Sequence, residues 1–265
     1  MEPWHEPHPL QSVRLKIGRA EQHLEAIDGY VDKYKAAAPY NIIYNLNSEK
    51  TFHEGRLYAK FPPFLDFGIA VGEFAYQLRS ALDNLVYALA RPNFPGSFGS
   101  RERERAEKST MFPILLVENR DAILGRIAHV ASATKDAVFD AIDKHQPYKN
   151  GNRAEYHVLS VLEEINIRDK HRVINAATAN ITIQTDNIPE GVELRQGSVN
   201  NREVVVRIPA HLNAEADFHP RFSFQIILPV GRPAGGVSIY ALRPIHEYVR
   251  DKVMPDFTGF FPPEP

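Results

Sequence analysis

The sequence lacks cysteine throughout its 265 residues. This absence excludes disulfide bonds, thiolate nucleophiles and cysteine-based zinc sites together. The sequence also lacks any apolar run approaching the roughly 18 residues that indicate a membrane-spanning helix. The first ten residues hold three prolines and no apolar core segment, which is not the pattern of a secretory signal. These absences together predict a cytoplasmic protein with no membrane contact.

An excess of charge of one sign is missing as well, because 31 Lys and Arg face 33 Asp and Glu for a formal net charge of -2. Sequence-independent binding of nucleic acid depends on a basic excess, so any contact with RNA would have to be local. What the chain does have is an ordinary globular composition, with 43% hydrophobic and 24% charged residues. That length and composition suffice for one extensive core.

The sequence pattern predicts mainly helices in the first half of the chain. Residues 11 to 38 carry an apolar residue alternately four and three positions apart, which predicts a long amphipathic helix. Such a seam packs either within its own domain or across a coiled-coil dimer, and the pattern leaves both open. Residues 65 to 91 are apolar nearly all round and predict a central buried helix. Residues 92 to 110, with a mixed charge run, predict a solvated loop.

Residues 119 to 146 predict a helix that breaks near Ser132, and residues 153 to 172 a further helix. Residues 41 to 46 and 51 to 61 predict a β-hairpin, and the period of the pattern changes from 3.6 to 2 after residue 172. The short strands expected there are 173–184, 192–194, 202–208, 221–228 and 237–242. A short helix over 244 to 254 precedes a tail whose Phe257, Phe260 and Phe261 are expected to pack back on the domain.

The predicted fold class is α+β, with a helical layer around a central buried helix, packed against an antiparallel sheet whose apolar face covers the helices. We expect a single domain over residues 1 to 265. Its parts are helix-rich (11–172), strand-rich (173–242) and a C-terminal helix and tail (243–265).

Charged side chains occupy positions that the helical pattern turns inward. The apolar stripe of residues 158 to 165 continues into Asp169 and Arg172. A buried charge costs several kcal/mol, roughly, unless it is paired and hydrogen-bonded. On the central helix Arg79 lies among small residues, with Asp83 one turn further along. Packing of the two helices would therefore pair Arg79 with Asp169 and Asp83 with Arg172.

This predicted polar centre has a structural interpretation, in which it fixes helix register, and a functional one. In the functional interpretation, guanidinium groups hold a small anion such as a phosphate while His171 or a carboxylate moves a proton. The catalytic candidates are Arg79 and His171. The ligand-binding candidates are Arg79, Asp83, Asn84, Asp169 and Arg172. No histidine pair at helical ligand spacing occurs, so we predict neither a metal nor a cofactor.

Four segments also occur together in a recognisable order: RSALDNLVYAL at residues 79–89, Phe112-Pro113-Ile114, Gln146-Pro147-Tyr148 and Asp169-Lys170-His171-Arg172. In this order, over about residues 10 to 175, the chain resembles a family of uncharacterised bacterial proteins that pair an RSALDxLVxxL helix with a later DKHR helix end. The resemblance implies a bacterial protein and carries no established activity.

A more distant likeness is to the HEPN superfamily of helical proteins, many of them ribonucleases of bacterial defence, whose signature is Arg-x(4 to 6)-His. Arg79 would be the arginine of that signature, but the positions for the histidine hold Asn84, Leu85 and Val86. Asparagine cannot serve as a general acid or base near neutral pH.

Three hypotheses follow from the sequence. The first is a non-catalytic or weakly catalytic protein whose Arg/Asp network binds a small anion. The second is a HEPN-like ribonuclease or defence-related protein acting on RNA through Arg79 and His171. The third is a homodimeric assembly module that pairs through its first helix.

Overall fold

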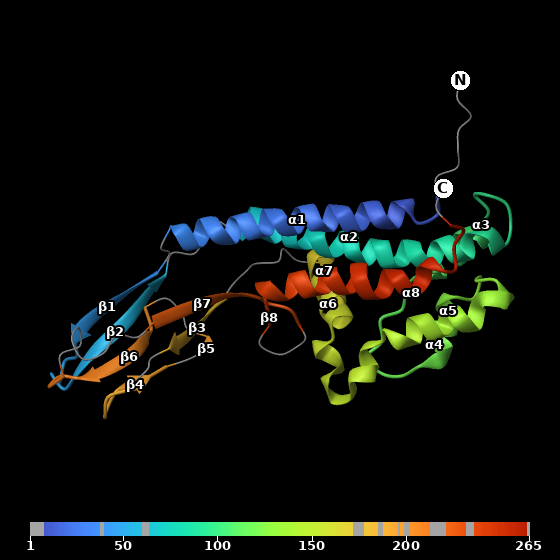
Figure 1. The fold of residues 1–265 in the computed structure, drawn as a ribbon. Coiled ribbons are helices and arrows are strands. Elements are labelled where there is room, and N and C mark those ends of the chain that lie inside the picture. The colour runs from blue at the N-terminus through green and yellow to red at the C-terminus, as the bar shows by residue number, and fades with distance from the viewer. Residues whose placement is uncertain are drawn as a thin grey trace, which may run out of the picture.

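The computed structural model describes residues 8–37, 40–59, 64–171, 178–184, 188–195, 197–198, 202–212, 221–231 and 236–263. These residues form a layer of helices with two β-sheets extending from one of its ends (Figure 1). The α+β class predicted from the sequence is therefore confirmed. No helix in the described ranges has both the length and the apolar character needed to cross a membrane.

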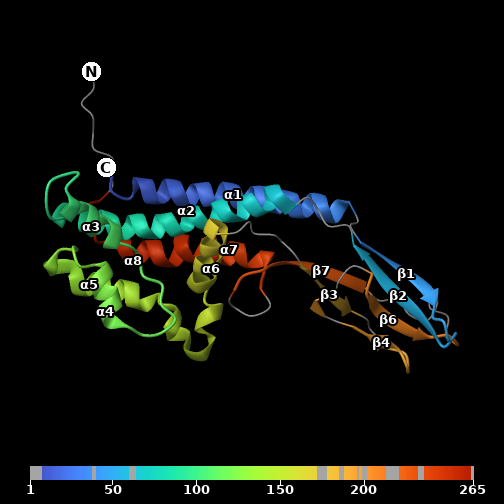
Figure 2. The same cartoon turned by 180° about the vertical axis from the view of Figure 1, so that it is seen from behind.

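Helices α1 (Gln11–Ala36) and α2 (Phe64–Ala90) lie side by side along most of their length (Figures 1 and 2). The apolar seam predicted for the first helix is buried in the chain's own core. Its buried members are Val13, Ile17, Ala20, Leu24, Ile27 and Val31. Burying an aliphatic side chain of this kind contributes about 1.5 to 3 kcal/mol, so the α1 seam anchors the helical layer. The apolar seam of α1 therefore packs within its own chain.

The middle of the chain is a series of shorter helices. They are η1 (Arg91–Asn93), α3 (Arg101–Ser109), α4 (Arg120–Arg126), α5 (Ser132–Lys144), η2 (Pro147–Tyr156) and α6 (Val158–His171). The predicted break near residue 132 is present, between α4 and α5.

The charge run at residues 101–105 is the beginning of helix α3, so the prediction of a loop there is wrong. The Ser100 hydroxyl accepts a hydrogen bond from the backbone N–H of Arg103, at 3.2 Å, and caps the helix. Arg103 and Glu107 form an ion pair one turn apart, and Ala106 is buried. Capping and local pairing stabilise a helix that has almost no apolar face.

The C-terminal segment forms η3 (Ile239–Ala241), α7 (Leu242–Tyr248), a π-helical turn η4 (Val249–Val253) and α8 (Met254–Thr258). Phe257 is fully buried, and Phe260 and Phe261 pack against the same helical core. The expectation that these three rings pack back on the domain is confirmed.

Both sheets are antiparallel and four-stranded. The first has the order β1 (Tyr40–Leu46), β2 (Phe52–Ala59), β6 (Val204–Pro209), β4 (Glu193–Leu194). The second has the order β5 (Gly197–Ser198), β3 (Thr178–Gln184), β7 (Arg221–Leu228), β8 (Val237–Ser238). Strands β1 and β2 form the predicted hairpin, and the Asn47 side chain accepts hydrogen bonds from the backbone N–H groups of Thr51 and Phe52 at the turn.

The sheets do not cover the helical layer, contrary to the prediction, but project beyond its end (Figures 1 and 2). The first sheet has a small core of its own, made of Leu57, Val205, Val206 and Ile208. Among the residues that the structure describes, Ile226, Leu228 and Val237 join the second sheet to the helical core. In the described part of the chain, α1, α6 and α7 pack against α2 and against one another, so the helices bury their apolar surface mainly among themselves.

Candidate functional site

Arg79, in the middle of α2, is the centre of a buried polar cluster and is only 7% exposed. Its Nη1 donates to Asp83 Oδ1 at 2.6 Å, and its Nη2 donates to the backbone carbonyl of Phe112 at 2.9 Å. Its Nε lies 2.8 Å from Glu163 Oε2 on α6. One guanidinium therefore ties α2 to α6 and to the segment that precedes α4.

The contact between Arg79 and Glu163 is an ion pair rather than an aligned hydrogen bond. Although the two atoms lie at ion-pair distance, Glu163 Oε2 is buried and accepts no hydrogen bond of good geometry from any described residue. The Glu163 side chain as a whole keeps 31% exposure, so this ion pair is not fully removed from water. Its desolvation penalty is therefore smaller than that of a fully buried pair.

One carboxylate oxygen of Asp83 accepts two hydrogen bonds. Its Oδ1 accepts from Arg79 and, at 3.0 Å, from the backbone N–H of Phe112. Burial raises the pKa of Asp83 above its usual value, and the Arg79 guanidinium and the Phe112 N–H oppose that rise. With Glu163, the cluster sets two carboxylates around one guanidinium, which repels a further anion.

Gln146 supports the other side of the same segment, which we name the strap (residues 112–115). The Gln146 amide is completely buried; its Nε2 donates to the carbonyl of Pro113 at 2.9 Å and its Oε1 accepts from Leu115 N–H at 3.0 Å. Side chains thus satisfy the Phe112 N–H and carbonyl, the Pro113 carbonyl and the Leu115 N–H of the strap, and the Leu115 carbonyl accepts from the backbone N–H of Tyr148. The motifs at residues 79–83, 112–114 and 146–148 meet here, and their contacts are structural.

The predicted pair of Arg79 with Asp169 is wrong, because Arg79 pairs with Asp83 and Glu163. The predicted pair of Asp83 with Arg172 stays a prediction. The Asp169 carboxylate instead packs against Gly72, at an exposed position. Although the residue as a whole is exposed, desolvation of its carboxylate against α2 and the neighbouring Glu73 raise the pKa of Asp169. Arg172 lies outside the described residues.

The register of two helices accounts for this difference. On α2 and α6 the contacts run in opposite directions, with Arg79 against Glu163 and Gly72 against Asp169. Seven residues of α-helix span about 10 Å, so Asp169 faces α2 as predicted but too far along it to reach Arg79. His171 is the last residue of α6, and its side chain is outside the described part.

The close approach of Asp169 to Gly72 gives a first testable prediction. A Cβ on Gly72 would lie 2.0 Å from Asp169 Oδ1. Alanine in place of glycine inside a helix ordinarily stabilises by about 1 kcal/mol. We expect Gly72→Ala to lower the free energy of unfolding in the wild-type chain and to raise it by about 1 kcal/mol in an Asp169→Ala background.

Urea denaturation of the four variants of this cycle measures the coupling, and Gly18→Ala on α1 is the matched control. A Cβ at Gly18 would meet no atom within 4 Å, so that substitution should stabilise in both backgrounds. An effect of Gly72→Ala that is the same with and without the Asp169 carboxylate would contradict the proposed clash.

A second polar cluster surrounds His145, which is 3% exposed at the end of α5. Its Nδ1 lies 3.0 Å from the Tyr248 hydroxyl, and its Nε2 lies 2.7 Å from Asp256 Oδ2. Burial lowers the pKa of His145, and Asp256 opposes that change. His157 packs edge-on against the same tyrosine ring. Among the described residues no three His, Asp or Glu side chains are placed to hold a metal ion.

The π-helical turn η4 explains how this second cluster assembles. In a regular α-helix, Tyr248 and Asp256 would point about 80° apart. The wider π turn between them lowers the rotation per residue and brings both side chains to the His145 ring. Sequence periodicity carried no signal for this turn. Since both ring nitrogens are occupied, His145 serves to join α5 to the C-terminal helices.

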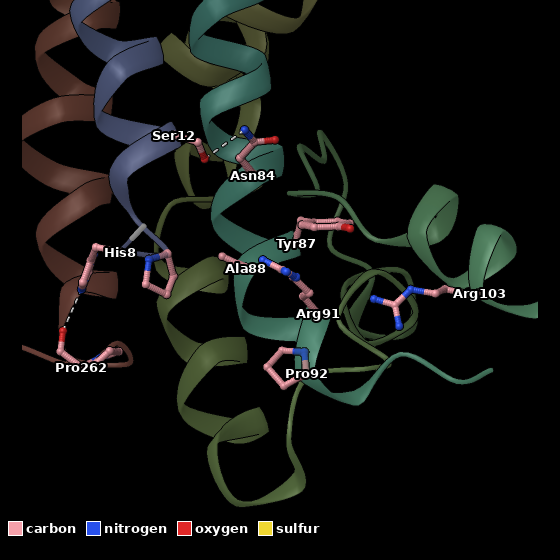
Figure 3. A pocket seen from close by; sticks show the side chains of 10 residues that line it. His8, Ser12, Asn84, Tyr87, Ala88, Arg91, Pro92, Arg103 and Pro262 are labelled. Carbon is pink, nitrogen blue, oxygen red and sulfur yellow. Dashed lines mark hydrogen bonds between the residues drawn. The ribbon is translucent and has the colours of Figure 1, made fainter. Parts of the chain in front are cut away.

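A pocket of about 730 Å³ lies where the beginning of α1, the end of α2 and α3 meet (Figure 3). Its lining residues are His8, Pro9, Ser12, Asn84, Tyr87, Ala88, Arg91, Pro92, Arg103 and Pro262. Asn84 is the one predicted site residue among them, and its Nδ2 donates to Ser12 Oγ at 3.4 Å. Arg79, Asp83 and Asp169 are not among the residues that line this pocket.

The charged side chains in the described lining of this pocket are basic. Arg91 and Arg103 reach it from η1 and α3, and this lining contains no Asp or Glu. Glu107, behind the lining, offsets part of this charge, since its Oε1 lies 3.1 Å from Arg103 Nε and accepts from the Tyr87 hydroxyl. The first turn of α1 contains no acidic residue, so the positive end of that long helix adds to the potential.

Comparison of the chain with protein-family profiles, with curated proteins and with solved structures finds no significant match in any of the three. The fold and the polar groups therefore define a class only. It is an α+β protein with a buried arginine ion-pair cluster and a separate basic pocket at the end of its helical layer.

Proposed function

We propose that the protein binds a small phosphate-bearing anion in the pocket between α1, α2 and α3, without catalysing a reaction on it. The observation that carries this proposal is that two arginines and two neutral polar side chains line one cavity. Arg91 and Arg103 reach it beside Asn84 and Ser12, whereas the Arg79 guanidinium is buried and held by two carboxylates. The Arg79 cluster then organises the fold, and the anion site lies elsewhere.

The chemistry of the lining suits a phosphate. A guanidinium offers a planar fork of donors that matches phosphate oxygens, and Asn84 and Ser12 supply neutral hydrogen-bonding groups beside it. The cavity of about 730 Å³ lies within the roughly 300 to 1,000 Å³ typical of small-molecule sites. It leaves space for a group larger than the phosphate alone.

Titration calorimetry with inorganic phosphate, pyrophosphate and adenosine monophosphate tests the proposal. A hydrogen bond to a charged group contributes about 1.5 to 3 kcal/mol, so we expect Arg91→Ala to weaken binding by roughly 10- to 100-fold. Arg243→Ala is the matched control, because Arg243 pairs with Asp28 on an exposed surface away from the pocket lining. Absence of binding by the wild-type chain, or an equal loss in both variants, would refute the proposal.

The HEPN-like ribonuclease remains the alternative to this function. It would require Arg79 to meet an RNA phosphate, but the Arg79 guanidinium is buried and engaged with Asp83, Glu163 and the Phe112 carbonyl. Asn84, at a position where that superfamily has histidine, instead donates to Ser12. Incubation of the protein with total RNA decides between the two, since cleavage lost in Arg79→Lys with the fold intact would favour the ribonuclease.

A further inference from the structure

In the part of the chain that the structure describes, β1 is the longest edge strand of the two sheets. Among the described strands it pairs with β2 alone, and it is seven residues long. The other edge strands, β4, β5 and β8, have two residues each. Figures 1 and 2 place β1 at the outer margin of the sheets. Every second residue of such an edge presents its N–H and C=O groups to whatever lies beside it.

The usual devices that protect an edge strand are missing from β1. Soluble proteins blunt their edges with lysine, proline, a bulge or a short strand. The sequence of β1, Tyr-Asn-Ile-Ile-Tyr-Asn-Leu, contains no charge and no proline. Its pairing with β2 runs without interruption from Tyr40 to Leu46. On this strand Ile43 is 41% exposed and Leu46 is 45% exposed.

The sequence of β1 is complementary to itself when it is read in the opposite direction. In an antiparallel pair of two β1 strands centred on Ile43, Asn41 would oppose Asn45, and Ile42 would oppose Tyr44. Opposed residues share a face, so the amides would meet amides and the apolar side chains would meet apolar ones. An antiparallel strand pair of this kind is compatible with a two-fold axis.

The small core of the first sheet would gain from this pairing. Ile42 and Tyr44 point to that core and are only half buried at the open edge. The core itself contains only four buried residues in the described part of the chain. A second copy would place its own Ile42 and Tyr44 beside them and join the two cores across the edge, which buries more apolar surface for each chain.

We propose that two copies of the chain pair antiparallel through β1, about a two-fold axis at Ile43, and form one continuous sheet. The partner is a second copy because the edge matches itself in length, in side-chain type and in its lack of charge. This interface differs from the first-helix dimer that was one of the three hypotheses from the sequence, since the α1 seam is buried within the chain.

The first test places a charge at the proposed axis. Light scattering over a range of concentrations should find a dimer for the wild-type chain and a monomer for Ile43→Lys, with dimerisation weakened at least tenfold. Leu15→Lys is the matched control, because Leu15 is an exposed apolar residue on α1, and this variant should remain dimeric. Equal circular dichroism spectra and melting temperatures would show that the variants are folded.

A mixture of Ile43→Lys with Ile43→Glu tests the register. Each variant alone sets two like charges opposite each other, whereas the mixture pairs opposite charges and should restore a dimer containing one chain of each kind. A monomeric wild-type chain, a dimeric Ile43→Lys variant, or dissociation caused by Leu15→Lys instead would each overturn the proposal.

The absence of cysteine allows a covalent test as well. In Ile43→Cys the new thiol is the only one in the chain, so mild oxidation should link two copies through opposed residues. Leu15→Cys, treated in the same way, should stay uncrosslinked. Crosslinking of both variants to the same extent would indicate random collision and would count against the β1 interface.

Discussion

Replacing Arg79 with methionine is expected to lower the free energy of unfolding by roughly 3 to 5 kcal/mol, the range found when one partner of a buried ion pair is removed. Methionine fills a similar length with apolar atoms, so the loss reports mainly on charge and hydrogen bonding. It would leave the Asp83 carboxylate, the Glu163 carboxylate and the Phe112 carbonyl without the guanidinium that now contacts all three. Urea denaturation with a constant m-value measures this loss.

Arg243→Met is the control for this prediction, because it removes the same chemical group from an exposed ion pair with Asp28. Exposed pairs contribute about 0 to 1 kcal/mol, so the control should be nearly neutral. Glu163→Gln should have an intermediate effect, since the contacts of Arg79 with Asp83 and Phe112 remain. If Arg79→Met cost no more than Arg243→Met, the buried cluster would not stabilise the fold as we infer.

The long helices could be predicted from the sequence because their patterns are local. The seam from Val13 to Val31 repeats along one face, and the apolar stretch after residue 64 needs no partner to be identified as a buried helix. The hairpin of β1 and β2 was predictable for a similar reason, since two alternating segments flank a short polar turn. In each case the neighbours in sequence carry the information.

The partner of Arg79 could not be predicted in this way. A helical wheel assigns a residue to a face but gives no position along the axis at which two helices cross. Asp169 does face α2, yet it meets Gly72, and the longer side chain of Glu163 reaches the guanidinium from beside the apolar stripe. Non-local packing therefore decides which carboxylate is used.

Local sequence patterns could not predict the basic pocket either. Its walls come from the N-terminal segment at His8, η1 at Arg91, helix α3 at Arg103 and the C-terminal tail at Pro262 (Figure 3). Only the folded chain brings these four segments together. The position of the sheets depends in the same way on how fully the helices cover one another.

Gln146→Leu is the second substitution with a large expected effect, about 2 to 4 kcal/mol of unfolding free energy, because each buried backbone group left without a partner costs about 1 to 3 kcal/mol. Leucine would fit the volume of the buried amide while removing the acceptor for Leu115 N–H and the donor to the Pro113 carbonyl. The strap has no neighbouring strand to replace these bonds.

Gln22→Leu on the exposed side of α1 makes the identical substitution where the side chain only accepts from Arg19, so its effect should stay within about 0.5 kcal/mol. Hydrogen exchange measures the protection of individual amides, which the overall free energy of unfolding does not report. Protection of the Leu115 amide should fall in Gln146→Leu more than that of amides in the middle of α2. Unchanged protection at Leu115 would mean that another group accepts the hydrogen bond from the Leu115 N–H. The contacts among the three motifs would then not be what holds the strap in place.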